Sequence, residues 1–126
     1  MQVLFKTRDF IFAAEFNNSK TAQEIISRLP LASNVSIWGN EIYFDIGFKA
    51  SAEAATMEVC IGDVAYWPQG KCLCIFFGPT PASTTNIPVP ASPVVIVGKI
   101  KTAIKDLKAV QLGDSIFVEL SEESRK

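Results

Sequence analysis

Residues 38–46 read WGNEIYFDI, and this stretch decides the class of fold. Gly39-Asn40 is a turn signal, and behind it apolar residues alternate with other side chains. The apolar set is Ile42, Phe44 and Ile46. Such alternation predicts a half-buried strand that has one face toward a core and one face outward. Glu41 and Tyr43 are therefore expected on the outer face of a sheet.

Similar short apolar runs, separated by turn residues, occur on both sides of this stretch. The expected strands are 3–8, 10–16, 35–39, 41–46, 57–61, 64–67, 72–77, 94–97 and 115–120. One clear helix is expected between a cap at Asn18 or Ser19 and a stop at Pro30, with a second short turn or helix at 101–108. Many short strands and few helices predict a mainly β protein, a closed or nearly closed β-barrel with one or two short helices.

Two of these strands differ from the others because both of their faces are apolar. Residues 72–77 and 94–97 must be covered on each side, by the core on one side and by a helix, a loop or a ligand on the other. The intervening residues 78–93 contain five prolines, which exclude regular structure and predict a cover or a functional loop. Residues 121–126 are expected to form a solvated tail.

Composition limits the classes of function. The 126 residues are 48% apolar and 20% charged, which predicts one globular domain over 1–126. A net charge of −1 argues against a nucleic-acid partner. The absence of histidine excludes catalysis by serine–histidine or cysteine–histidine pairs. No apolar run approaches the ~18 residues of a membrane span, so no membrane partner is expected.

The three cysteines argue for a reduced protein. Cys60, Cys72 and Cys74 are an odd number, which does not suit a closed set of disulfides. Cys72 and Cys74 share one strand face within an apolar stretch, where they are expected to be buried thiols. A fourth soft ligand for zinc is lacking, so neither a metal nor a cofactor is expected. The cytoplasm is the expected compartment.

Several stretches carry a more specific signal, in a fixed order along the chain. They are residues 38–44, 62–70, 74–83, 90–92 and 97–100. With these motifs the sequence resembles the small prokaryotic cyclophilin-like family, a family of mostly unknown function, over nearly the whole chain. The resemblance implies a barrel like that of the cyclophilins, which are prolyl cis–trans isomerases. It does not by itself transfer an activity.

The same resemblance bears on catalysis. Cyclophilins bind proline in an apolar pocket outside the barrel and use an arginine near the prolyl nitrogen. This chain has arginine only at Arg8, Arg28 and Arg125, none of them within residues 41–48, where the resemblance would place it. No catalytic residue is therefore assigned. If the protein is an enzyme at all, prolyl isomerisation is the class that the resemblance implies.

The leading hypothesis is a module that binds a peptide or small ligand on an aromatic patch of the outer face. The candidate residues are Glu41, Tyr43, Tyr66, Trp67 and Phe76. Two alternatives stay open: a weak prolyl isomerase that lacks the arginine, and a structural or interaction subunit that forms a homodimer. A third interpretation makes the aromatic residues ordinary core packing, with the proline-rich loop lying over the tyrosines.

Overall fold

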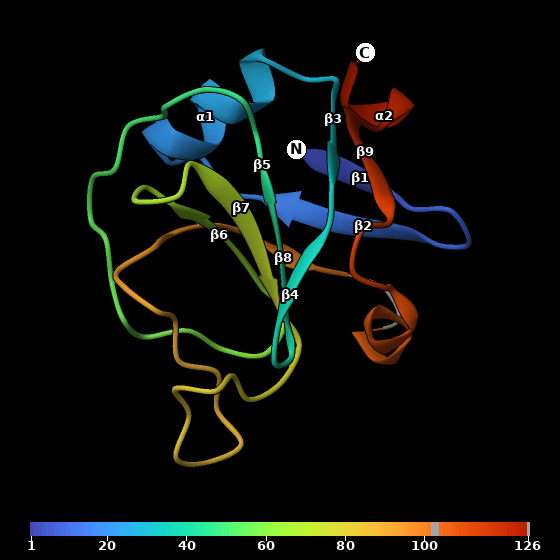
Figure 1. Ribbon diagram of the computed structural model, residues 1–126. Helices are drawn as coiled ribbons and strands as arrows, with labels where there is room; N and C mark the ends of the chain where they lie inside the picture. The colour runs from blue at the N-terminus through green and yellow to red at the C-terminus, as the bar shows by residue number, and fades with distance from the viewer. Residues whose placement is uncertain (102–103, 126) are drawn as a thin grey trace.

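The computed structural model describes residues 1–101 and 104–125. Within them, nine strands form one antiparallel sheet that curls into a nearly closed barrel (Figure 1). The strands are β1 (Gln2–Lys6), β2 (Ile11–Phe16), β3 (Leu31–Asn34), β4 (Ser36–Trp38), β5 (Glu41–Asp45), β6 (Asp63–Trp67), β7 (Cys72–Phe76), β8 (Val95–Ile100) and β9 (Ser115–Leu120). Their order in the sheet is β3-β9-β1-β2-β8-β6-β7-β5-β4. The predicted fold class is confirmed.

The two end strands of this sheet are consecutive in the chain. Only Val35 separates β3, which pairs with β9, from β4, which pairs with β5. Val35 is buried, and its amide donates to the carbonyl of Asp114 at 2.8 Å. One segment therefore spans the gap between the ends of the sheet. This arrangement nearly closes the barrel without a direct β3–β4 ladder.

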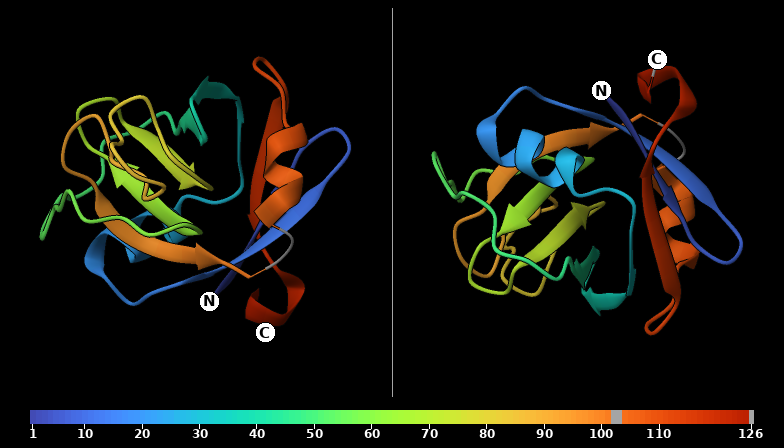
Figure 2. Two further views of the ribbon diagram at one scale, coloured as in Figure 1. Left: turned by 90° about the horizontal axis from the view of Figure 1, so that it is seen from below. Right: turned by 90° about the horizontal axis from the view of Figure 1, so that it is seen from above.

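Helix α1 (Lys20–Ser27) lies at one end of the barrel, at the top of Figure 1 and toward the viewer in the right-hand view of Figure 2. Ser19 is its N-cap, and the Ser19 Oγ accepts from the amide of Ala22 at 3.2 Å. Ala22 and Ile25 are fully buried, so the apolar face of the helix packs on the core. Among the described residues, no helix has the length and apolarity needed to cross a bilayer.

The C-terminal third differs in detail from the expectation. A 3-10 helix, η1 (Ile104–Ala109), covers most of the range predicted as a short turn or helix, whose residues 102–103 lie outside the described ones. A short helix, α2 (Glu122–Arg125), occupies the segment expected to be a solvated tail; Lys126 lies outside the described residues. Ser121 is buried and donates its amide to the carbonyl of Gln2 at 3.0 Å, which ties this segment to β1.

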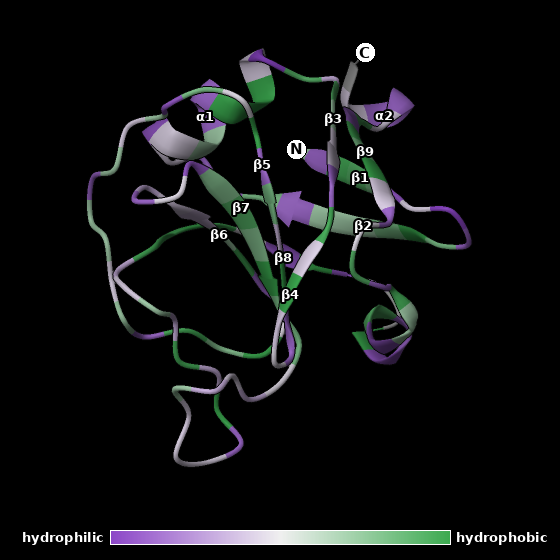
Figure 3. Ribbon diagram, in the orientation of Figure 1, coloured by the Kyte–Doolittle hydropathy of each residue, from purple (hydrophilic) through white to green (hydrophobic). Residues whose placement is uncertain are grey.

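Strand β7 has a separate apolar cluster on each face. Leu73 and Ile75 point into the barrel and belong to the main core, which also receives the buried side chains of β1, β2, α1 and β9. Cys72, Cys74 and Phe76 point outward into a smaller cluster. Figure 3 shows β7 as apolar along its length. The outer face of this strand is therefore covered by other parts of the chain, as its sequence requires.

Two local predictions are wrong. Residues 57–61 form no strand; Thr56 makes an isolated bridge with Val94, and Asp63 accepts the amide of Cys60 at 2.8 Å in a local turn. Val59 nevertheless packs in the outer cluster, which explains why the segment is apolar. Strand β3 was not expected, because its residues are half-buried or exposed and it is defined by pairing with β9.

Candidate ligand pocket on the outer face

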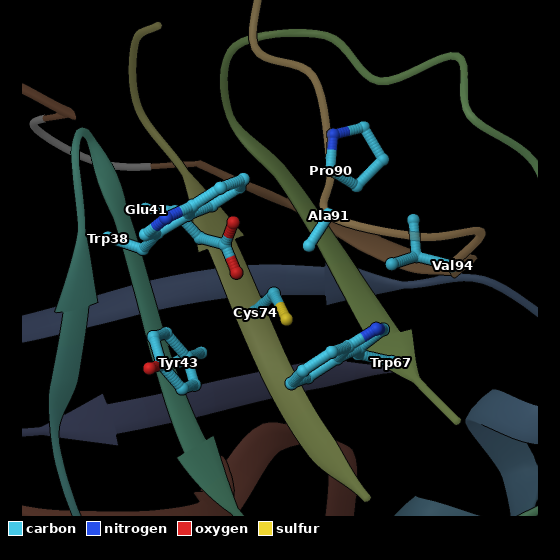
Figure 4. A pocket seen from close by; sticks show the side chains of 8 residues that line it. All are labelled: Trp38, Glu41, Tyr43, Trp67, Cys74, Pro90, Ala91 and Val94. Carbon is cyan, nitrogen blue, oxygen red and sulfur yellow. The ribbon is translucent and has the colours of Figure 1, made fainter. Parts of the chain in front are cut away.

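A cavity of about 140 Å³ opens on the outer face of the barrel, over strands β4, β5, β7 and β6 (Figure 4). We call it the outer pocket. Its lining residues are Trp38, Glu41, Tyr43, Trp67, Cys74, Pro90, Ala91 and Val94. Five of these eight come from neighbouring strands, and the last three come from the segment that leads into β8. The pocket therefore lies between the sheet and part of the proline-rich loop.

Strand register brings the sheet residues together. Glu41 and Tyr43 are two residues apart on β5, so both point outward. Trp38 pairs with Glu41 across the β4–β5 hairpin, and Cys74 pairs with Tyr43 across the β5–β7 ladder. Trp67 lies on the far side of β7, opposite Cys72. One outward face across four strands thus supplies three aromatic rings, one carboxyl group and one thiol.

Glu41 is the polar group at the base of the outer pocket. The residue is only 6% exposed, and Figure 4 shows its carboxyl group between Trp38 and Cys74. Burial raises the pKa of Glu41 to about 7, although a hydrogen bond with the Cys74 thiol partly opposes this effect. The carboxyl group can therefore gain or lose a proton close to neutral pH.

The two thiols near Glu41 are poor nucleophiles. Burial, together with the nearby Glu41 carboxyl group, raises the pKa of Cys74 well above its ordinary range. Burial and the charges of Asp45 and Glu41 raise the pKa of Cys72 to about 11. Because the thiolate is the nucleophile, thiol chemistry is suppressed here. All three cysteines are free thiols.

Trp67 is held in place from two sides. Its indole Nε1 donates to the Ser92 hydroxyl at 2.6 Å, and that hydroxyl donates to the Gln69 side chain at 2.9 Å. A Cβ atom at Gly70 would overlap the Trp67 ring, so only glycine leaves room for it. The Tyr43 ring meets the Trp67 ring edge to face, with centroids 6.3 Å apart. The aromatic wall is thus fixed before any ligand arrives.

The proline-rich loop is tied to the hairpin beside the pocket. The amide of Asn40 donates to the carbonyl of Pro79 at 3.0 Å, and the Thr80 hydroxyl donates to the carbonyl of Val89 at 2.5 Å. Gly39 lies so close to Pro81 that a Cβ atom there would approach the proline ring to 2.7 Å. These contacts make the loop a hydrogen-bonded cover whose end, Pro90-Ala91, forms one wall of the pocket.

The structure brings together three of the five candidate residues. Glu41, Tyr43 and Trp67 line the outer pocket. Tyr66 does not, because it points into the barrel, where it is fully buried and its hydroxyl accepts the amide of Ala50 at 3.0 Å. Phe76 faces outward but is buried in the outer cluster and does not line the pocket. The prediction that Tyr66 belongs to the outer aromatic patch is therefore wrong.

Sequence reasoning left out the other lining residues. Trp38 had a usable signal, because a two-residue turn at Gly39-Asn40 places it opposite Glu41. Cys74 shares the outward face of β7 with Cys72. No local sequence pattern could have identified the last three lining residues, Pro90, Ala91 and Val94. Only the path of the loop brings them over the sheet.

The arginines lie elsewhere where the structure describes them. Arg8 is in the turn between β1 and β2, and the guanidinium of Arg28 lies over the Phe48 ring at 4.5 Å from its centroid. Among the described side chains, neither lysine nor arginine lines the outer pocket. The catalytic arginine of cyclophilins thus has no counterpart in this lining.

A family model described as cyclophilin-like matches residues 1–119. The chain belongs to the cyclophilin-like family. The fold of this cyclophilin-like protein is similar to the solution structure of the hypothetical protein AF2241 from Archaeoglobus fulgidus, with a TM-score of 0.83 and 35% identity. That similarity covers 96% of this chain and 95% of the archaeal one. A search of curated proteins finds no match.

Proposed function

We propose that this cyclophilin-like protein is a binding module that takes a small ligand, or one side chain of a peptide, in the outer pocket. One observation carries the proposal. Glu41, a residue that is only 6% exposed, lines a cavity whose walls include three aromatic side chains. A concave apolar site with a single well-placed polar group is the usual form of a small-molecule site.

The size of the cavity limits the bound group. A cavity of ~150 Å³ holds one benzene molecule, and the outer pocket is of about 140 Å³. A single ring or a short branched group therefore fits, such as a proline ring. A longer peptide would place one residue in the pocket and the rest on the surface beside it.

The test uses the fact that the chain has two tryptophans and both line the outer pocket. We expect ligands from a panel of small fragments and Xaa-Pro peptides to change the tryptophan fluorescence. They should also shift the NMR signals of Glu41, Tyr43 and Cys74. Tyr43→Ala should weaken binding about fivefold or more, since a ring contact contributes ~1 kcal/mol or more.

Phe117→Ala is the matched control, because Phe117 is a partly exposed aromatic residue on β9, away from the pocket. It should leave binding unchanged. NMR shifts that map around Phe117, or no binding by any member of the panel, would contradict the proposal.

The same samples also test the two alternative functions, a weak prolyl isomerase and a homodimeric subunit. Faster cis–trans exchange of the Xaa-Pro peptides, lost in Trp67→Ala, would instead indicate the weak isomerase. A doubled mass by light scattering would indicate the homodimer. Three free thiols, one of them exposed Cys60, fit the cytoplasmic compartment that we propose.

A further inference from the structure

The Glu41 carboxyl group has no counter-charge among the residues that the structure describes. The ion pairs found there join Met1 to Glu15, Lys6 to Glu119, Lys20 to Glu53 and Lys99 to Asp63. Glu41 instead shares a hydrogen bond with the Cys74 thiol, a weak partner. A buried carboxylate without a counter-charge is costly. The free space in front of it is therefore the natural place for a positive charge.

The walls of the outer pocket favour the same kind of occupant. The faces of aromatic rings carry partial negative charge and attract cations, with tryptophan the strongest of the three ring types. Trp38, Tyr43 and Trp67 line the same pocket as the carboxyl group of Glu41, and Trp38 lies next to that group (Figure 4). An anion would be repelled by both the rings and the carboxylate. A neutral apolar group would contact the rings but leave the carboxyl group unpaired.

We propose that the outer pocket binds an organic ammonium group, with Glu41 as its counter-ion and the rings of Trp38, Tyr43 and Trp67 around it. This inference rests on the proposed function and names the ligand class. The volume of about 140 Å³ admits a cationic group of about six non-hydrogen atoms, the size of benzene. A trimethylammonium group or the end of a short alkylamine has this size.

Binding of a cation must be linked to the protonation of Glu41. Burial raises the pKa of Glu41 to about 7, and a bound cation would lower it by favouring the ionised form. Among the described residues, the other titratable side chains that face Glu41 are Tyr43 on β5 and Cys72 and Cys74 on β7. Both thiols stay protonated near neutrality. Binding below about pH 7 therefore releases a proton.

The test compares cations with neutral molecules of the same shape. The probe pairs are choline with 3,3-dimethylbutan-1-ol and n-butylammonium with n-butanol. Calorimetry and tryptophan fluorescence give the affinities at several pH values, in buffers of different ionisation enthalpy. We expect at least one cation to bind about tenfold or more tightly than its neutral partner above pH 7. Its affinity should fall by up to about tenfold per pH unit below pH 7, with release of up to one proton.

Glu41→Gln keeps the shape of the side chain and removes its charge. It should abolish both the preference for the cation and the pH dependence, while the neutral partner still binds. Asp45→Asn is the matched control, because Asp45 is an exposed carboxylate on the same strand that does not line the pocket. Asp45→Asn should change neither the preference for the cation nor the pH dependence of binding. If Glu41→Gln fails to fold, the ratio of cation to neutral affinity and the proton release of the wild-type protein decide the question.

The outcomes separate the two proposals. Neutral molecules that bind as tightly as both cations would overturn the ammonium inference and leave the binding module standing. An equal preference for the cation in Glu41→Gln would also overturn it. No binding of these probes, of the fragments or of the peptides would overturn both.

Discussion

Glu41 shows how the surroundings of one residue set its chemistry. Asp45 lies four residues further along the same strand face and is exposed, whereas Glu41 is buried between β4, β7 and the proline-rich loop. Burial raises the pKa of Glu41 to about 7. The consequence is that its ionisation acts against the folded state, since the unfolded chain ionises near 4.5.

The stability of the protein should accordingly depend on Glu41 between pH 4.5 and about 7. Below this range the Glu41 carboxyl group is protonated in both the folded and the unfolded state, so its ionisation does not change the free energy of unfolding. As pH rises through the range, the unfolded state loses its proton first, so the free energy of unfolding falls by up to about 3 kcal/mol. Glu41→Gln should remove this fall, so that it is more stable than wild type at about pH 8 but not at about pH 4.

Urea unfolding at several pH values measures this effect. Asp45→Asn serves as the control and should follow the wild-type curve, because its carboxyl group is exposed. If the free energies of unfolding of wild type and Glu41→Gln differed by the same amount at every pH, the ionisation of Glu41 would not be what destabilises the folded protein.

At the scale of single elements, the turn between β6 and β7 and the end of the proline-rich loop act together on Trp67. Gly70 leaves space for the indole ring, and Ser92 receives its N–H. Both residues belong to sequence motifs that are separate in the chain, 62–70 and 90–92. Together they hold one wall of the outer pocket.

Gly70→Ala should therefore displace Trp67 and damage the pocket. The added methyl group would overlap the ring, so the ring must move, and the hydrogen bond to Ser92 is lost with it. We expect a shift of the tryptophan emission and a loss of ligand affinity of about tenfold or more, with a cost in stability of ~1 kcal/mol or more.

Gly47→Ala is the comparison for backbone strain. Gly47 has a φ of +83°, and no atom lies within 4 Å of the position that a Cβ atom would take, so alanine strains the turn without touching a ring. It should lower stability and leave the tryptophan emission unchanged. Equal emission shifts in the two variants would argue against a direct role for Gly70.

At the scale of the whole molecule, the two clusters on either side of β7 make this strand the centre of the fold. It pairs with β5 and β6 along its length, and all five of its residues are buried. The end strands β3 and β4 each have a ladder on one side only. Resistance to local opening should follow this pattern.

Hydrogen exchange measured by NMR should rank the strands in that order. We expect the amides of β7 to exchange at rates close to the global unfolding limit. Amides of β3 and β4 that are bonded in a ladder should exchange about a hundredfold faster or more, since opening an end strand breaks one ladder only and exposes less buried surface. Uniform rates across the sheet would show that the barrel opens as one unit and would contradict this ranking.

The local pattern of the sequence was sufficient to predict most strands of the barrel and some residues of the outer pocket. Alternation in 41–46 placed Glu41 and Tyr43 outward, and the double-faced apolar character of 72–77 required a second cluster. Tyr66 was assigned to the patch together with Trp67, because both residues lie beside the expected turn at 68–70. Adjacent residues on a strand point to opposite faces, so the same rule of alternation excludes it.

Local patterns in the sequence thus predicted the class of fold and the outward direction of single side chains, because periods of two and turn residues are local properties. The family was indicated separately, by the resemblance of several motifs in a fixed order. Which outward residues share a cavity depends on the path of the whole chain in three dimensions. Trp67 and Glu41 come from strands separated by β7, and Pro90 and Val94 reach them through the path of a long loop. The raised pKa of Glu41 follows from that convergence, since burial is a property of all the segments that cover a group together.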